Sequence, residues 1–312
     1  MDKFLISIVS GTFNESENIE VLYNKILKNI SNYEGRYNFE IIVIDNASTD
    51  DTVVKLKNLA INDGRLKVIV NNRNFGHIRS PYWGILQAQG DAIIYLASDL
   101  QDPPELIPEL ISEWENGWQV VMAVKPRSQT GIFIYSLRKI YYRMLSQVAD
   151  VPIVHDATGF GLYDKKVIDN IRNINDPYPF FRGLVSELGF PVKTISFEQP
   201  RRVHGISKNN FYTLYDIAML GIVSHSMLPL RLAGMTGFLM SVLSFIAGLV
   251  YLFLKLLNWH SFPIGMAPLV IGVFFLFGML FAFIGLLGEY IGAIHNYLKK
   301  RPVVVEKERV NF

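Results

Sequence analysis

The fold is decided at residues 92–105, which read Ala92-Ile93-Ile94-Tyr95-Leu96-Ala97-Ser98-Asp99-Leu100-Gln101-Asp102-Pro103-Pro104-Glu105. Ala92–Leu96 is a short, continuously apolar run, which is typical of a strand buried on both faces of a parallel sheet. The run ends in a turn rich in carboxylate and amide groups, Ser98–Glu105. Ligands of parallel sheets bind at the carboxyl ends of the strands, so this stretch predicts a strand that delivers polar groups to a site.

The same pattern recurs on both sides of this stretch. Short apolar runs predict further strands at Phe4–Val9, Glu40–Ile44, Leu66–Val70 and Val120–Val124. Helical patterns lie between the strands, at Asn18–Ile30, Asp51–Leu59, Ser80–Gln89 and Glu105–Trp114. This alternation predicts an α/β fold with a mostly parallel sheet covered on both faces. Each polar cluster after a strand could be a simple turn or helix cap, but four clusters at one edge favour a shared site.

Composition excludes several function classes. The 312 residues carry a formal net charge of +2, so no overall field favours a nucleic-acid partner. The absence of cysteine excludes disulfides and thiolate metal sites. The apolar run at the start of the chain, up to Val9, is too short for a signal peptide and fits a first buried strand, which predicts a cytoplasmic domain.

Two stretches near the C-terminus are long enough to cross a membrane. Leu232–Leu254 and Ser261–Gly288 contain no charged residue, whereas a transmembrane helix needs about 20 apolar residues. Two buried helices of a soluble domain are the weaker alternative, because such helices have a polar face. The sequence therefore predicts transmembrane helices at about 232–257 and 264–288, within a membrane region of residues 231–298.

The flanks of this region predict its orientation. Arg231 precedes it and Lys299, Lys300 and Arg301 follow it, so both termini are expected in the cytoplasm of an integral, multi-pass protein of a bacterial inner or plasma membrane. Glycines within the helices would allow close packing in the pair or in a homo-oligomer. The remaining chain divides into a cytoplasmic domain at 1–210, an interfacial helix at 211–230 and a cytoplasmic tail at 299–312.

Residues 132–148 form a basic amphipathic pattern. Apolar side chains fall on one helical face, and Arg138, Lys139 and Arg143 fall on the other. Such a helix can lie on a bilayer surface, and it can equally pack on a core with a solvated basic face. Both interpretations stay open from the sequence.

Several motifs together resemble one family, the family-two glycosyltransferases of the GT-A fold. The likeness is strongest to the polyprenyl-phosphate glycosyltransferases, which include dolichol-phosphate-mannose synthase and bacterial undecaprenyl-phosphate hexose transferases. The motifs occur in the same order as in that group, although no single one is decisive, and they are Thr12–Glu15, Ile44–Asp50, Arg73–Gly76, Gly90-Asp91, Ser98–Glu105, Asp156–Phe160, Arg202–Lys208 and Ser226–Arg231.

The resemblance implies a nucleoside-diphosphate sugar as donor, with a uridine diphosphate hexose as the first expectation. Asp45 would bind the nucleobase or ribose, since a carboxylate accepts two hydrogen bonds. Asp99 and Gln101 would hold Mg²⁺ or Mn²⁺ on the donor diphosphate. The other donor-binding residues implied are Thr12, Asn14, Glu15, Asn46, Gly76 and Ser98.

The resemblance also implies an anionic lipid acceptor, a polyprenyl phosphate, which needs cations rather than a strong base. Arg202 and Lys208 would seat its phosphate, with help from Arg138 and Ser207. Asp99, Asp156, Arg202 and Lys208 form the expected catalytic set, and Asp156 would orient the reactants or act as a base. The implied reaction is a single inverting displacement that yields a sugar-phosphoryl-polyprenol for cell-surface glycan modification.

The sequence departs from the family pattern at three positions. Ala97 stands where the first aspartate of an Asp-X-Asp motif is expected, Asn46 replaces a common second aspartate, and Gly11 replaces a common proline. The loss at Ala97 predicts weaker or altered metal binding.

Two other functions are weighed against this one. Gln199–Val203 resembles the Gln-X-X-Arg-Trp signature of processive polysaccharide synthases but lacks its tryptophan, and two spans are too few for a translocation channel. A non-catalytic membrane scaffold with a degenerate site is the second alternative, and the retained carboxylates and cations count against it.

Overall fold

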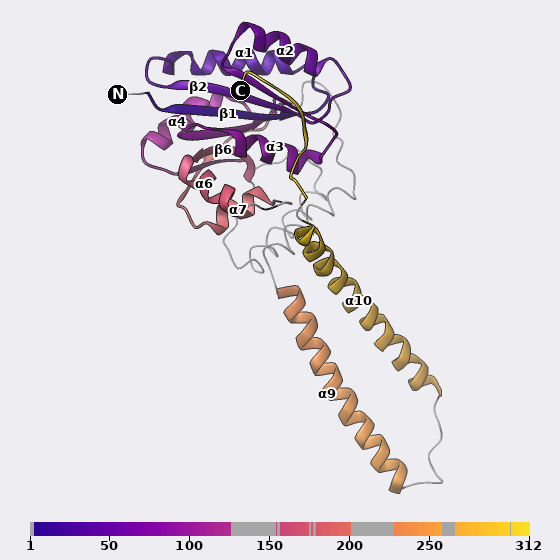
Figure 1. The fold of residues 1–312 in the computed structure, drawn as a ribbon. Helices are drawn as coiled ribbons and strands as arrows, with labels where there is room; N and C mark the ends of the chain where they lie inside the picture. The colour runs from indigo at the N-terminus through magenta and orange to yellow at the C-terminus, as the bar shows by residue number, and fades with distance from the viewer. Residues whose placement is uncertain are drawn as a thin grey trace.

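The structure is a computed structural model and describes residues 3–125, 154, 157–174, 176, 179–200, 228–257, 266–299 and 301–312. An α/β domain contains one sheet with helices on both sides, and two long helices project from it (Figure 1). These are α9, Leu228–Leu257, and α10, Met266–Leu298, which lie next to each other. The predicted architecture of an α/β domain followed by a helix pair agrees with this arrangement.

The sheet has eight strands in the order β7-β5-β6-β4-β1-β2-β3-β8. Its central strands β4, β1, β2 and β3 are parallel neighbours, which confirms the predicted mostly parallel sheet. β6 is antiparallel to β4 and β5, and β8 is antiparallel to β3. The strands are β1 Leu5–Thr12, β2 Asn38–Asp45, β3 Leu66–Asn71, β4 Ala92–Ala97, β5 Val120–Val124, β6 Ala157–Asp164, β7 Val192–Ser196 and β8 Glu306–Val310.

Helices cover both faces of the sheet and create two cores. On one face α1 (Ile19–Ile30), α2 (Thr52–Asn62) and α4 (Ile107–Glu115) bury apolar side chains against the strands. On the other face α3 (Gly76–Gln87), α6 (Lys165–Ile174) and α7 (Phe181–Glu187) do the same. A short 3-10 turn, Pro104–Leu106, precedes α4, and another, Ser31–Tyr33, follows α1.

Helix α3 begins earlier than the sequence predicts, at Gly76 instead of Ser80. The Asn74 side chain accepts a hydrogen bond from the Gly76 amide at 2.8 Å, which satisfies a donor that the helix itself leaves unpaired. Pro81 lies within the helix and its ring packs on Gly11 of β1, where an added Cβ would be 2.7 Å from the ring. The glycine at position 11 thus permits close contact between α3 and the sheet.

Strand β8 changes the expected role of the C-terminal residues. Residues 299–312 are predicted as a tail, yet Glu306–Val310 pairs with β3 as the edge strand of the sheet. Val303 and Val304, just before this strand, are buried in the core that α3 covers. The α/β domain therefore draws on residues from both sides of the helix pair, and its extent differs from the predicted 1–210.

The helix pair exposes a large apolar surface. In α10, Phe275–His295 has a mean hydropathy of 1.8, and within the described residues this is the one helix found long and apolar enough to cross a membrane. α9 covers the first predicted span, 232–257, and α10 covers the second from Met266 onward and continues ten residues beyond it to Leu298. The amphipathic helix predicted at 132–148 lies outside the described residues, as does all of the one predicted at 211–230 except its last three residues, which begin α9.

Candidate functional site

The carboxyl ends of the central strands meet at one edge of the sheet. In the strand register Thr12 of β1 lies beside Asp45 of β2, and Gly11 lies beside Ala97 of β4. The polar loops that follow these strands are therefore neighbours, as the sequence predicts. We call this cluster of loops, residues 12–15, 45–50, 71–76 and 97–102, the donor edge, after the donor substrate that the family resemblance implies.

Asp45 lies at the centre of the donor edge and is fully buried. Its carboxylate accepts hydrogen bonds from the Ser48 amide, at 2.9 Å, and from the Ser48 hydroxyl. Burial raises the pKa of Asp45 even though these bonds favour the charged form. The carboxylate is fixed in place by its own turn before any ligand arrives.

The loops after β1 and β2 are joined by reciprocal hydrogen bonds. The Asn14 amide donates to the Ser48 hydroxyl at 2.8 Å, and the Thr49 amide donates to the Asn14 side chain at 2.8 Å. Asn14 and Ala47 have φ angles of 54° and 61°, in the left-handed region that non-glycine residues avoid. Strained backbone of this kind is concentrated at ligand sites, where surrounding contacts hold it.

Thr12 and Glu15 line the same edge in different ways. The Thr12 hydroxyl is buried and has no hydrogen-bond partner among the described residues, so it is a polar group placed where a ligand atom could pair with it. The Glu15 carboxylate accepts a hydrogen bond from the Asn18 side chain at 2.6 Å. The Glu15 amide donates to the Thr52 hydroxyl at 3.0 Å, which ties this loop to α2.

The Asn46 side chain faces the loop between β3 and α3. It is buried and makes hydrogen bonds to four groups of residues 71–76. Gly76, at the end of this loop, has a φ angle of 89° and gives its carbonyl to Asn46 at 3.2 Å. Asn46 and Gly76 therefore contact each other, which their positions in the sequence do not predict.

The turn after β4 carries the predicted metal ligands. Asp99 accepts a hydrogen bond from the Gln101 amide at 3.1 Å, and Leu100 between them has a φ angle of 60°. The Ser98 hydroxyl donates to the Gly11 carbonyl at 2.9 Å and so fixes the turn to β1. Asp99 and Gln101 thus occur on one tight turn, with an oxygen-bearing side chain on each.

Asp102 is the buried residue at the end of this turn, and its side chain bonds back to the start of the turn. It is 5% exposed and accepts a hydrogen bond from the Ala97 amide at 3.0 Å. Burial, together with the charge of Asp99, raises the pKa of Asp102 to about 6. In the part of the chain that the structure describes, no three His, Asp or Glu side chains cluster as a ready metal cage. One carboxylate and one amide fit a cation that takes its other ligands from phosphate and water.

Five of the predicted site residues lie outside the described residues. These are the catalytic and acceptor residues Arg138, Asp156, Arg202, Ser207 and Lys208. The sequence reasoning missed Ser48, which joins two loops, although its place three residues after Asp45 is a known turn pattern. It also missed Asn71 and Asn74 as partners of Asn46, because nothing in the local sequence signals that contact.

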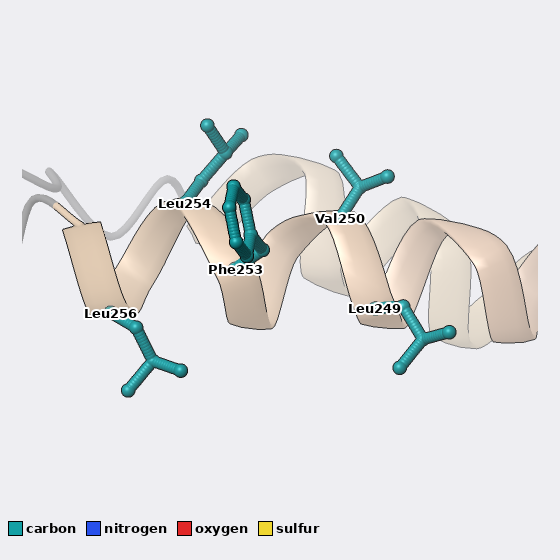
Figure 2. Close-up of a pocket in the computed structure, with 5 residues that line it drawn as sticks. All are labelled: Leu249, Val250, Phe253, Leu254 and Leu256. Atoms are coloured by element: carbon teal, nitrogen blue, oxygen red, sulfur yellow. The ribbon is translucent and has the colours of Figure 1, made fainter.

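A separate apolar pocket lies on α9. Figure 2 shows its five lining residues, which all project from one helix: Leu249, Val250, Phe253, Leu254 and Leu256. These side chains are exposed and carry no polar group. The pocket suits apolar contacts and not a charged nucleotide, so the donor edge is the better candidate for polar chemistry.

Comparison with known proteins places these loops within a family domain. A family model for glycosyl transferase family 2 matches residues 7–172, which include every loop of the donor edge. A Bacillus subtilis (strain 168) protein named uncharacterized glycosyltransferase YkcC is 34% identical over 300 residues, covering 96% of this chain and 92% of that protein. The SfII prophage-derived bactoprenol glucosyl transferase of Shigella flexneri is 32% identical over 306 residues, covering 97% of each.

Solved structures show a more distant likeness. The mannosyltransferase PcManGT from Pyrobaculum calidifontis, in complex with GDP-Man and Mn²⁺, aligns with a TM-score of 0.46 and 15% identity, over 96% of this chain and 89% of that one. The assignment rests instead on the sequence relatives and the family model. Since that model covers more than half of the chain and the relatives align along nearly all of it, the chain is a glycosyltransferase and belongs to glycosyl transferase family 2.

Proposed function

We propose that the protein transfers a hexose from a nucleoside-diphosphate sugar, with a uridine diphosphate hexose as the first candidate, to a polyprenyl phosphate at the cytoplasmic face of a membrane. The observation that carries this proposal is the end-to-end similarity to proteins named bactoprenol glucosyl transferase, at 32% identity and 97% coverage of both chains. The donor edge and the apolar helix pair supply the two surfaces that such a reaction needs.

The donor would bind at the edge formed by Thr12, Asn14, Glu15 and Asp45. The fixed carboxylate of Asp45 accepts hydrogen bonds from a nucleobase imide or from ribose hydroxyls. The buried Thr12 hydroxyl supplies a further polar contact within the same edge. The Asp45 carboxylate is held by Ser48 before the donor arrives, which reduces the entropy cost of binding.

Asp99 and Gln101 would hold a divalent cation, Mg²⁺ or Mn²⁺. Such a cation would stabilise the negative charge that develops on the departing nucleoside diphosphate. The turn from Ser98 to Asp102 keeps both side chains at the edge. Asp102 would support this turn from its buried position and not as a ligand.

The acceptor phosphate would be seated by Arg138, Arg202, Ser207 and Lys208. An oxygen of the lipid phosphate attacks the anomeric carbon as the bond to the nucleoside diphosphate breaks, so the configuration at that carbon inverts. The lipid phosphate is a monoester that is already ionised at neutral pH, so it needs no strong base, and Asp156 would orient the reacting groups. The product is a sugar-phosphoryl-polyprenol that serves as a lipid-linked sugar donor.

The arrangement of the chain supports a membrane hairpin with both ends on one side. Strands β1–β7 precede α9, and β8 follows α10, yet all eight strands belong to one sheet. A helix pair that crosses a membrane between these strands must return to the side that it left. The basic flanks at Arg231 and Arg301 support the cytoplasm as that side.

The experiment follows the labelled sugar in membranes that contain the full chain. We expect radiolabel from a nucleotide sugar to enter a butanol-extractable lipid in the presence of Mg²⁺ or Mn²⁺. Asp99→Asn should reduce this incorporation by about 100-fold, because loss of a metal carboxylate removes several kcal/mol of stabilisation. Glu109→Gln, the same chemical change at an exposed position on α4, should leave it intact.

Two outcomes would contradict the proposal. Label in a high-molecular-weight polymer would favour a polysaccharide synthase. No turnover of any nucleotide sugar by the wild-type protein, under either metal, would favour a scaffold without catalytic activity.

A further inference from the structure

The Asn46 side chain uses its full hydrogen-bonding capacity inside the protein. A carboxamide has two acceptor sites on its oxygen and two donor hydrogens on its nitrogen. The oxygen accepts from the Phe75 amide at 2.8 Å and from the Asn71 side chain at 3.3 Å. The nitrogen donates to the Asn74 side chain at 3.0 Å and to the Gly76 carbonyl at 3.2 Å. Asn46 is 5% exposed, so little of it remains for a ligand.

Two backbone groups determine which end of the carboxamide faces which partner. The Phe75 amide can only donate, and the Gly76 carbonyl can only accept. The oxygen of Asn46 must therefore face Phe75 and its nitrogen must face Gly76. An aspartate has the same shape but, when ionised, donates nothing, so its second oxygen would lie against the Gly76 carbonyl.

The contacts of Asn46 fix the loop 71–76 from the side of the sheet. From the other side, the Asn72 amide donates to the Val305 carbonyl at 2.9 Å, just before β8. The loop carries the Arg73 guanidinium, which stacks over the Phe75 ring at 4.1 Å. Because Asn46 bonds directly to the Phe75 amide, it helps to fix the Phe75 residue whose ring contacts the Arg73 guanidinium.

We propose that Asn46 is a positioning residue that fixes the loop 71–76 at the donor edge, and that this role requires a carboxamide at position 46. This differs from the role of donor contact expected from the family resemblance. The inference rests on the proposed function for its catalytic consequence, but the effect on the loop is independent of it. The aspartate common at this position in the family would break two of the four hydrogen bonds described here.

The first test compares two substitutions that add the same charge in the same network. Asn46→Asp removes the donors to Asn74 and Gly76, and should raise the donor KM about 10- to 100-fold with a much smaller change in kcat and in the acceptor KM. Asn74→Asp is the matched control. The Asn74 oxygen accepts from Asn46 and from the Gly76 amide, and both bonds survive in an aspartate, so Asn74→Asp should raise the donor KM less than Asn46→Asp does.

The second test reads the loop without any substrate. Hydrogen exchange of the amides in residues 71–76 should be faster in donor-free Asn46→Asp than in the wild type, by about tenfold or more, and unchanged in Asn74→Asp. As the pH is lowered, the ratio of the exchange rate in Asn46→Asp to that in the wild type should fall, since a protonated carboxyl at position 46 regains one donor.

Three results would overturn the proposal. One is a raised donor KM in Asn46→Asp with unchanged exchange in the donor-free loop, which would make Asn46 a direct donor contact. Another is an equal effect of both substitutions, which would indicate a general effect of charge. The third is an Asn46→Asp protein with wild-type exchange and kinetics. If the wild-type protein transfers no sugar, the proposed function fails, and the exchange experiment still decides the role of Asn46.

Discussion

Ser48 joins two loops of the donor edge through one hydroxyl group. It donates to Asp45 and accepts from the Asn14 amide. Removing this hydroxyl leaves the Asn14 amide without its acceptor, and Asn14 holds a left-handed backbone conformation that depends on neighbouring contacts. The side chain that sets the geometry of the edge is thus a serine that need not touch the donor itself.

We expect Ser48→Ala to lower the free energy of unfolding by about 1–2 kcal/mol, since one bond is lost and a partly buried donor is left unpaired. The donor KM should rise as the Asp45 carboxylate loses its fixed position. Thermal unfolding with and without a nucleotide sugar measures both effects. Thr49→Ala is the control, because the Thr49 hydroxyl contacts Asn14 only at 3.4 Å, whereas its amide keeps the shorter bond. Equal losses in the two variants would contradict this role for Ser48.

Sequence could predict which residues lie at the donor edge but not what each one does there. Asp45, Asn14 and Asp99 follow predicted strands, so their common location follows from the rule for parallel sheets. Whether a side chain faces a ligand or another loop depends on the path of the returning chain. Asn46 illustrates this limit. Its four partners come from residues 71–76, and no sequence pattern near position 46 indicates that it contacts them.

At the scale of elements, Glu40 ties several strands together at the end of the sheet opposite the donor edge. This buried carboxylate of β2 pairs with Lys67 of β3 at 2.7 Å, and accepts from Ser7 of β1 and from the Gln89 amide before β4. Burial alone would raise the pKa of Glu40, but these hydrogen bonds hold it below its ordinary value of 4.5. Glu40 therefore stabilises the fold in its charged form.

Glu40→Gln should destabilise the protein by about 2 kcal/mol at neutral pH, because bonds to a charged group are lost. The contribution of Glu40 is fully present above its ordinary pKa and is lost as the pH falls through its lower folded-state pKa. The difference between wild type and variant should accordingly be constant from pH 8 to about pH 5, and shrink below that. Chemical denaturation across this range measures it, and activity at neutral pH should persist.

The matched comparison is Glu308→Gln, which removes a partly exposed pair with Lys57, in contrast to the buried Glu40. Exposed pairs contribute about 0–1 kcal/mol, so this variant should unfold almost as the wild type does. A larger loss in the free energy of unfolding for Glu308→Gln than for Glu40→Gln would contradict a stabilising role for the buried Glu40 carboxylate.

The first half of the domain was predictable from apolar and amphipathic patterns, whereas β6, β7, α6 and α7 were not predicted. β1 to β5 and α1 to α4 were predicted within a few residues, since buried strands and amphipathic helices carry strong patterns. β8 was not predicted, because Glu306–Val310 reads Glu-Lys-Glu-Arg-Val and alternates no apolar face. Charged residues are common on edge strands, where they discourage pairing with other chains.

At the scale of the whole molecule, strands of one sheet precede and follow the helix pair in the chain. The segment after α10 is anchored by buried Val303 and Val304, by the Pro302 carbonyl that accepts from Arg79 at 2.6 Å, and by β8 itself. Trp83 of α3 also donates to the Glu306 carboxylate. The bonds to Arg79 and Trp83 join the C-terminal segment to α3, and the pairing of β8 with β3 covers the edge of the sheet.

We expect a chain that ends after residue 300 to be less stable than the full chain, with its melting temperature lower by roughly 5 °C or more. Loss of β8 leaves the edge of β3 unpaired, so this variant should also aggregate more readily. Thermal unfolding and light scattering in detergent measure the two effects. Arg309→Lys, which keeps the strand and its charge, is the control. An unchanged melting temperature after truncation would contradict a structural role for β8.

The position of β8 in the chain has a consequence for biosynthesis. A ribosome delivers β1 to β7 first, then both long helices, and β8 only afterwards. Folding of the sheet therefore cannot be completed before α9 and α10 have been made, and while they are made β3 has an open edge. For a helix pair that inserts into a membrane, as proposed above, insertion and closure of the sheet would be successive steps of one pathway. A delay in insertion would then prolong the interval in which chaperones or proteases can act on the unpaired edge of β3.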